Sequence, residues 1–340
     1  MLKTFDEVFD DYTKYGTKIK TEQYHTIGTN IIIDQGQSDI AGYTDQSDGL
    51  FTDVPVIVFG DHTRIIKYIN RPFFLGADGT KILKSKIPDA NYKYLYYALK
   101  NAKIPNTGYN RHFKWLKQIS ISYPEYQKQR IIVEILDKLE DNIGDYNTIL
   151  RLLDELVKAR FVEMFGTPYG NEKGFPMMTV DDVIEFTGGA QPDKKYFEYE
   201  ATADNIRLIQ IRDYKTDSYV TYIPRSMAKR FCNADDIMIG RYGPPIFQIL
   251  KGIEGAYNVA LMKATPKRGN KEFIRYFLKQ DCLFTYLDKL SQRTAGQSGI
   301  EMPALKAYPF PYPPVELQEQ FADFVQQVDK SKYDDMYIRD

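Results

Sequence analysis

The chain contains an internal repeat, which limits the folds it can adopt. Residues 123–130 read YPEYQKQR and residues 312–320 read YPPVELQEQ. A shift of 189 residues carries Tyr123, Pro124 and Gln129 onto Tyr312, Pro313 and Gln318. The same shift carries Ile132, Leu136 and Leu139 onto Phe321, Val325 and Val328, and Ile121 onto Phe310. Apolar positions four and then three apart, in register after a shared proline, predict two related helices.

The repeat extends upstream of these helices. VIVFG (56–60) matches DIMIG (236–240) at a shift of 180, and GADGTKILK (76–84) matches GAYNVALMK (255–263) at a shift of 179. These segments are typical of short apolar strands joined by glycine turns. Helical stretches follow at 91–102 and 271–290. We therefore predict an α+β fold with two similar, mixed α/β globular units.

A long helix is predicted between the two units, from Pro124 to about Phe165. Its apolar seam alternates steps of four and three residues, breaks at Arg160 and resumes at Met164; it comprises Ile132, Leu136, Leu139, Ile143, Tyr146, Leu150, Leu153 and Val157. Such a heptad seam is typical of a coiled coil. Some forty residues would span roughly 60 Å, which suits a spacer arm. The alternative is an amphipathic helix packed on a single unit.

Four segments follow from this pattern: a first unit at 1–123, a central helix at 124–166, a second unit at 167–313 and a distal helix at 314–340.

The acidic N-terminal stretch MLKTFDEVFDDYTKYG does not resemble a signal peptide, and no run of eighteen apolar residues occurs. We expect a cytoplasmic chain without membrane contact. The two cysteines, Cys232 and Cys282, form no CxxC and are expected to be buried free thiols. A net charge of −1 argues against coating nucleic acid by charge alone, and three histidines offer little for a metal site.

Six further segments carry a family resemblance: DQGQSDIAGYTD (34–45), VFGDHTRIIKY (58–68), GADGTKIL (76–83), FTGGAQPDKKYF (186–197), RYGPP (241–245) and AGQSGI (295–300). With the repeated helix entries, they make the chain resemble the specificity subunit of type I restriction–modification systems over nearly its whole length. The resemblance implies two target-recognition domains alternating with two helices that pair as an antiparallel coiled coil. Each domain would read one half of a split, asymmetric DNA target.

The resemblance also implies that the chain has no catalytic residues, metal or cofactor of its own. Its expected partners are double-stranded DNA, up to two adenine methyltransferase subunits that bind S-adenosylmethionine, and restriction subunits that use ATP and magnesium. By this resemblance, the chain would direct methylation and cleavage by these partners.

Candidate DNA-binding residues are polar side chains on loops that follow apolar strands, where they can reach base edges or phosphates. In the first half they are His62, Thr63, Arg64, Lys67, Tyr109, Asn110, Arg111 and His112. In the second half they are Gln191, Lys194 and Lys195 after a double glycine, then Arg241, Tyr242, Gln297 and Ser298. Lys67 is placed to reach a phosphate. The alternative for each Arg or Lys is an ordinary solvated position beside a turn.

The distal helix departs from the family pattern. Its seam matches the central helix at Phe321, Val325 and Val328, but the next seam positions are Lys332, Asp335 and Arg339. The family's distal helix continues for several more turns, so we expect a truncated form. Apolar positions on the central helix would then be covered in trans, by methyltransferase subunits first and otherwise by self-association with a second copy.

One rival function is metal-dependent nuclease activity. Pro192-Asp193 followed by Asp213, Tyr214 and Lys215 fits the loose PD…(D/E)xK pattern, whose carboxylates and lysine could hold magnesium beside a phosphate. YGPPIF (242–247) is similar to an amino-methyltransferase signature, but Gly243 replaces the side chain that must accept from the target amino group. The sequence therefore leaves the nuclease function open, but it argues against a methyltransferase.

Overall fold

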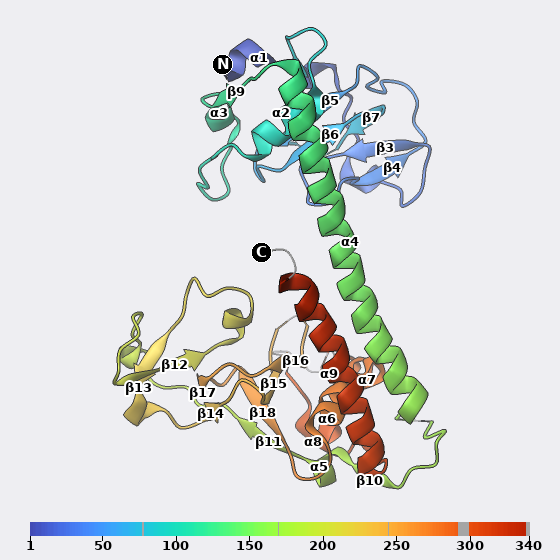
Figure 1. Ribbon diagram of the computed structural model, residues 1–340, viewed down its shortest axis with the longest axis vertical. Helices are drawn as coiled ribbons and strands as arrows, with labels where there is room; N and C mark the ends of the chain where they lie inside the picture. The colour runs from blue at the N-terminus through green and yellow to red at the C-terminus, as the bar shows by residue number, and fades with distance from the viewer. Residues whose placement is uncertain (77, 169, 244, 292–298, 338–340) are drawn as a thin grey trace. The chain divides into compact units, whose positions relative to one another are not determined.

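The computed structural model describes residues 1–76, 78–168, 170–243, 245–291 and 299–337 (Figure 1). The chain divides into two compact units, Met1–Tyr146 and Asn147–Asp340. The boundary falls inside the long helix α4 (Tyr126–Phe165), so that helix belongs partly to each unit. The prediction of two mixed α/β units joined by a helix of some forty residues is confirmed. None of the helices in the described ranges is long and apolar enough to cross a membrane.

The first unit is built on two small sheets. An antiparallel sheet has the strand order β2 (Phe9–Asp11), β8 (Thr80–Ser85), β5 (Val56–Gly60), β6 (Ile66–Ile69). A second sheet has the order β4 (Gly42–Thr44), β3 (Asn30–Ile33), β7 (Phe73–Leu75), in which β3 and β7 run parallel. A separate pair joins β1 (Leu2–Thr4) to β9 (Ser120–Ser122). Every residue of β5 is buried, as expected for an apolar run at the centre of a sheet.

The second unit repeats this plan. Its antiparallel sheet has the order β11 (Ile184–Gly188), β18 (Leu261–Pro266), β15 (Ile237–Gly240), β16 (Gln248–Lys251). The other sheet has the order β13 (Tyr222–Pro224), β12 (Asn205–Ile209), β17 (Gly255–Tyr257), β14 (Phe231–Cys232), again with one parallel pair, β12 and β17. The terminal pair is β10 (Met177–Thr179) with β19 (Pro309–Pro311). The repeat seen in the sequence is therefore a repeat of topology.

Most helices also correspond. The pairs are α1 (Phe5–Val8) with α5 (Val180–Val183), α2 (Tyr92–Lys100) with α6 (Lys271–Leu278), α3 (Phe113–Leu116) with α8 (Met302–Lys306), and α4 with α9 (Val315–Tyr337). Helix α7 (Asp281–Ser291) has no counterpart in the described part of the first unit. The side chains of Asn91 and Asn270 cap α2 and α6 in the same way, by accepting from backbone N–H groups. The stretch expected as one helix at 271–290 is two helices, because α6 ends at its C-cap Lys279 and α7 begins at Asp281.

The register of one repeat segment was predicted wrongly. Val58 pairs with Ile82 in the first unit, and Met238 pairs with Lys263 in the second. Strands β8 and β18 therefore correspond at a shift of 181 residues, not at the 179 expected from their glycines. Side chains in a strand alternate with a period of two, so a two-residue slip leaves the apolar pattern unchanged. Backbone pairing reveals the slip.

The C-terminal half of α4 packs against α9 within the second unit. Phe161 and Phe165 both contact Phe321 edge-on, and Lys332 donates to Asp154 at 2.7 Å. Later residues of α9 therefore meet earlier residues of α4, and the two helices run antiparallel, as Figure 1 shows. The expected antiparallel pairing of the distal helix with the central one is confirmed.

The repeated proline and glutamine have a structural role at the start of each helix. Gln129 and Gln318 are both buried, and each donates its side-chain amide to the carbonyl of the proline five residues before it, Pro124 or Pro313, at 2.8 Å. Each bond satisfies a carbonyl at the turn into the helix. The repeated signal is therefore a helix-entry motif.

Candidate nucleic-acid interface

In the first unit, two loops that carry predicted site residues lie together. The backbone N–H of His112 donates to the carbonyl of Asp61 at 2.7 Å, and the N–H of Phe113 donates to the Asp61 carboxylate at 2.7 Å. These bonds hold the loop after β5 against the loop before α3. The ring of Tyr109 stacks on the ring of His62 with 4.8 Å between centroids and 10° between planes. Side chains 47 residues apart in the sequence thus form one surface.

Gln35, which was not among the predicted DNA-binding residues, joins a third loop to this surface. Its side-chain oxygen accepts from the N–H of His62 at 3.0 Å, and its carbonyl accepts from the Thr63 hydroxyl at 2.7 Å. Its amide donates to the carbonyl of Asp78 at 2.7 Å. Gln35 lies in the short polar segment DQGQ directly after β3. A polar loop after an apolar strand is the pattern that predicted the other site residues, so it could have predicted Gln35 as well. Asp61, which was also missed, fixes the other side of the same loop.

Several predicted residues are exposed on this surface. They are Thr63, Tyr109, Asn110 and Arg111, although the Thr63 hydroxyl donates to the carbonyl of Gln35 and the Asn110 amide donates to the carbonyl of Thr107. Arg64 adopts a left-handed backbone with φ of 63° and donates to the carbonyl of Ile104 at 3.3 Å, which turns the chain back toward β6. Tyr109, Asn110 and Arg111 thus bring a ring, an amide and a guanidinium at three successive positions, and side chains of these kinds stack on bases or bond to base edges and phosphates.

Two predicted contacts do not fit this surface. Lys67 is buried, and its ammonium donates to the carbonyl of Ser38 at 2.6 Å and faces the carboxylate of Asp34 at 3.7 Å. Burial lowers the pKa of Lys67, and the carboxylates of Asp34 and Asp39 offset this only in part. His112 is fully buried, with one ring nitrogen 3.0 Å from the carbonyl of Asp61. Both side chains bond inside the protein, so neither is placed to contact DNA.

In the second unit, the predicted residues surround the double glycine. The N–H of Gly189 donates to the carbonyl of Leu261 at 3.0 Å. A Cβ at Gly189 would lie 1.9 Å from the carbonyl oxygen of Asn258, so only glycine fits, and the expected close backbone approach is confirmed. The Arg241 guanidinium donates to the carbonyl of Val259 at 3.3 Å and lies over the ring of Tyr242 at 5.2 Å.

The remaining predicted residues of this unit lie on the adjoining loops. Gln191, Lys194 and Lys195 are exposed, and Lys195 pairs with Asp193 at 3.5 Å. Tyr242 forms a bridge with Gly299, so the loop before α8 reaches the turn after β15 as the corresponding loop does in the first unit. Gln297 and Ser298 lie outside the described residues.

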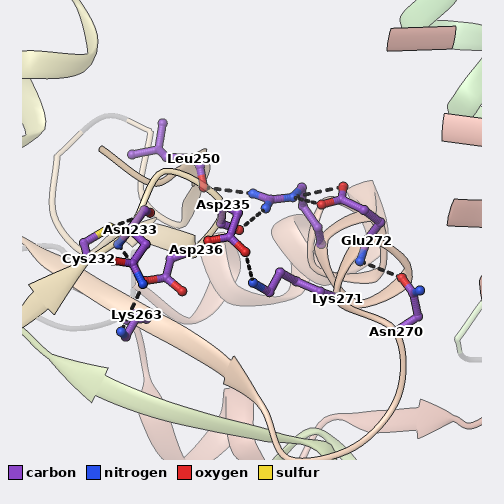
Figure 2. Close-up of polar contacts among 10 residues, drawn as sticks. Cys232, Asn233, Asp235, Asp236, Leu250, Lys263, Asn270, Lys271 and Glu272 are labelled. Carbon is purple, nitrogen blue, oxygen red and sulfur yellow. Dashed lines mark hydrogen bonds and ion pairs between the residues drawn. The ribbon is translucent and has the colours of Figure 1, made fainter. Parts of the chain in front are cut away.

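A polar cluster anchors the hairpin that carries Arg241 (Figure 2). Arg275 of α6 is buried, and its guanidinium donates to the carbonyls of Leu250 and Asp235 at 3.3 and 2.9 Å and to the carboxylate of Glu272. Asp236 accepts from the N–H of Asn233 at 2.9 Å and from Lys263 at 3.2 Å. These bonds fix β15 and β16 on α6, so the turn between them has a rigid base.

The geometry does not support the nuclease alternative. The Asp213 side chain has no exposed surface and faces Arg207 at 3.6 Å and Arg212 at 3.9 Å. Burial raises the pKa of Asp213, against the opposing influence of a backbone bond from Gln210 and of both arginines. Asp193 instead caps a short helical turn by accepting from the N–H of Lys195 at 3.1 Å. Within the described ranges, no group of three or more His, Cys, Asp or Glu side chains is arranged to hold a metal ion.

Cys232 is buried and Cys282 half-buried, and neither forms a disulfide. Burial raises the pKa of the Cys232 thiol to about 11. Such a thiol is a poor nucleophile at neutral pH. The prediction of buried thiols is therefore confirmed for Cys232, whereas Cys282 is only half-buried.

The predicted seam of α4 is partly covered. In the first unit Ile132 and Leu136 are half-buried, whereas Leu139 and Ile143 are 50% and 60% exposed. Tyr146, Leu150 and Leu153 are half-buried, and Val157 is buried. On α9, the predicted Phe321, Val325 and Val328 are all buried against α4 or the second unit's core.

The seam does not break at Arg160 and resume at Met164 as predicted. It continues in steps of four residues through Phe161 and Phe165, which were missed and are both buried. Because 3.6 residues complete a turn, steps of four rotate gradually around a straight helix. Phe161 and Phe165 therefore meet α6 of the second unit as well as α9.

Comparison with protein families matches residues 3–153 and 172–334 to one described as "Type I restriction modification DNA specificity domain". The chain belongs to this family. The two matched segments cover both units together with most of α4 and α9, so the resemblance seen in the sequence is confirmed.

One curated relative is the type I restriction enzyme EcoR124I/EcoR124II specificity subunit of Escherichia coli, 25% identical over 150 residues. That match covers 43% of this chain and 35% of the relative, so it spans about a third of the relative's length. A solved type I restriction–modification S subunit from M. genitalium is similar in fold, with a TM-score of 0.57 and 16% identity over 98% of this chain and 90% of that one. The specificity-subunit fold therefore extends over nearly the whole of this chain.

Proposed function

We propose that this specificity subunit reads a split, asymmetric DNA target, with one half-site for each unit, and has no catalytic role itself. The observation that carries the proposal is that the two units share one topology but present different side chains on corresponding loops. The loop after β5 carries His62 stacked on Tyr109, whereas the loop after β15 carries Arg241 over Tyr242. Different donors on a common scaffold favour different bases at the two half-sites.

The proposed partners come from the family. Adenine methyltransferase subunits, up to two, would bring S-adenosylmethionine, and restriction subunits would bring ATP and magnesium. The exposed apolar side chains of Leu139 and Ile143 favour a protein partner along α4, by preference a methyltransferase subunit and otherwise a second copy of this chain. The assembled complex would methylate and cleave DNA in the cytoplasm.

Co-expression with its methyltransferase subunit tests this function. The two proteins should co-purify, and sequencing of modified bases should show adenine methylation at one split site. Methyltransferase expressed without this chain is the control. If that control modified the same sites with the same preference, the chain would not be the source of specificity.

Exchange of residues 1–123 for the same region of another specificity subunit tests the division of labour. Because each unit has its own core and loops, the exchange should change one half of the methylated sequence and leave the other half intact. A change in both halves would show that the two units read DNA jointly.

A further inference from the structure

In the first unit, the loop after β3 (residues 34–39) is attached to the rest of the protein at two points. At its start, the side-chain oxygen of Gln35 accepts from the N–H of His62, in the loop after β5. Near its end, the ammonium of the buried Lys67 donates to the carbonyl of Ser38 at 2.6 Å. The two attachments fix the backbone that lies between them.

Gln37 lies between these attachments. Its side chain is exposed, and within the described ranges its amide forms no hydrogen bond. Because the backbone on either side is fixed, the residue loses little conformational freedom when it binds. Its amide carries a donor and an acceptor side by side, which is the pair that binds N6 and N7 of adenine in the major groove. Gln37 follows Gln35 by two residues and therefore lies beside the surface of His62 and Tyr109.

The second unit shows that the common fold does not need a lysine at the position of Lys67. In the first unit, Lys67 of β6 pairs with Val58 of β5. In the second unit, Leu250 of β16 pairs with Met238 of β15. Val58 corresponds to Met238 at the shift of 180 residues, so Lys67 corresponds to Leu250. Leu250 packs on a buried apolar cluster.

The loop after β12 is attached by apolar contacts instead. A Cβ at Gly60 would lie 2.8 Å from Gln35, and a Cβ at the corresponding Gly240 would lie 2.9 Å from Ile211. Gln35 and Ile211 therefore occupy equivalent places. Ile211 packs on the same apolar cluster as Leu250. Burying an ammonium costs more free energy than burying a leucine, so the lysine of the first unit serves its own polar loop and not the shared scaffold.

We propose that Gln37 contacts a base edge in the first half-site, with adenine as the favoured base, and that Lys67 is the positioning residue for this contact. Lys67 acts through the carbonyl of Ser38 and does not touch DNA. The arrangement belongs to the first unit alone, because Leu250 has no donor with which to hold a carbonyl. The inference rests on the proposed function, in which each unit reads one half-site.

The base preference of the assembled complex tests the role of Gln37. The chain is purified with its methyltransferase subunit, and binding is measured on DNA duplexes that differ from the target by one base pair. Gln37→Ala should reduce discrimination about ten-fold at one A·T position of the first half-site and leave the second half-site unchanged. Gln118→Ala, at an exposed glutamine outside this loop, should change neither. Unchanged discrimination in Gln37→Ala would overturn the proposal, and relaxation at a G·C position would refute the choice of adenine.

Lys67→Met tests the positioning role, because it removes the ammonium and keeps a long side chain. It should relax the preference at the same position as Gln37→Ala. The double variant should lose no more than the more affected single variant, since both changes act on one contact.

The matched control is Lys84→Met. Lys84 also attaches a loop, since its ammonium donates to the carbonyl and the carboxylate of Asp53 at 2.9 and 2.6 Å. This variant should lower the melting temperature without changing any base preference. A lower melting temperature for Lys67→Met with every base preference intact, or equal relaxation by Lys84→Met, would show that Lys67 is structural only. If the unaltered complex had no preference in the first half-site, the proposed function itself would fail.

Discussion

The ring of Phe161, on α4, lies nearly parallel to the ring of Phe273, on α6, with 5.5 Å between centroids and 13° between planes. Both rings are buried. The contact makes the end of the long helix part of the second unit's core, together with Phe165, Phe310 and Phe321. The helix is therefore a structural member of that unit and more than a connection to it.

Truncation of this contact should destabilise the second unit. Phe161→Ala removes a buried ring and leaves a cavity, so we expect a loss of about 3–5 kcal/mol in the free energy of unfolding. Val162→Ala, at an exposed position one residue along α4, should change it by less than about 0.5 kcal/mol. Denaturant unfolding followed by circular dichroism compares the two. Similar losses for both variants would contradict the assigned role of Phe161.

The two repeated glutamines should differ in their contribution. The Gln318 side chain makes two bonds, since its oxygen also accepts from the N–H of Asn270 at 2.8 Å. The corresponding oxygen of Gln129 is buried and has no hydrogen-bond partner in the part of the chain described. We expect Gln318→Ala to cost about 1–3 kcal/mol and Gln129→Ala less, because only the first leaves two backbone groups unpaired. Thermal unfolding of the two variants measures the difference, and an equal or reversed order would refute it.

Acid should loosen the contact between α2 and α4. Burial raises the pKa of Asp137, but bonds from Lys93 and Tyr97 outweigh it, so the pKa lies below its usual value. A carboxylate with a lowered pKa contributes stability above its unfolded pKa of about 3.9, and this stability is lost as the pH falls through the lower folded pKa.

Asp137→Asn should therefore cost about 1 kcal/mol at pH 6, and the difference from the original chain should shrink below about pH 3. Hydrogen exchange along α2 at the two pH values measures it. The matched control is Glu134→Gln, which removes the exposed pair of Glu134 with Lys138 and should have little effect at either pH. A pH-independent cost of Asp137→Asn would contradict the assignment.

Arg241 should influence the sequence that is methylated. If its guanidinium contacts a base, Arg241→Ala should cost on the order of 1–3 kcal/mol at one position of the target and relax the preference there. Arg241→Lys keeps the charge but cannot form the forked pair of bonds, so it should also lose the preference. Binding to a panel of single-base target variants is the measurement. Equal weakening on all targets by Arg241→Ala, with rescue by Arg241→Lys, would identify a phosphate contact.

Sequence patterns anticipated the features that depend on neighbouring residues. The repeat placed α4 and α9 to within a few residues, because Pro124, Pro313 and the glutamines that follow define where each helix starts. The glycine turns placed β5 and β15 correctly, and Gly189 was rightly expected where backbones approach closely. A second repeated motif was missed: Thr4 and Thr179 open α1 and α5 with the same capping box, to Glu7 and Asp182. The two segments that contain these capping boxes are short and share few identical residues, so the repeat was not recognised in the sequence.

Features that depend on distant contacts were decided by the tertiary structure. Lys67 and His112 were predicted as exposed because they are polar and lie near turns. Segments far away in the sequence bury both side chains. The spacing of apolar residues along α4 predicted one continuous seam. Only the folded structure shows that Val157 is buried while Leu139 is exposed. A sequence determines periodicity, caps and turns through local sterics and hydrogen bonding. Burial and partner choice arise from surfaces that meet only when the chain folds, so they cannot be read from the period of one helix.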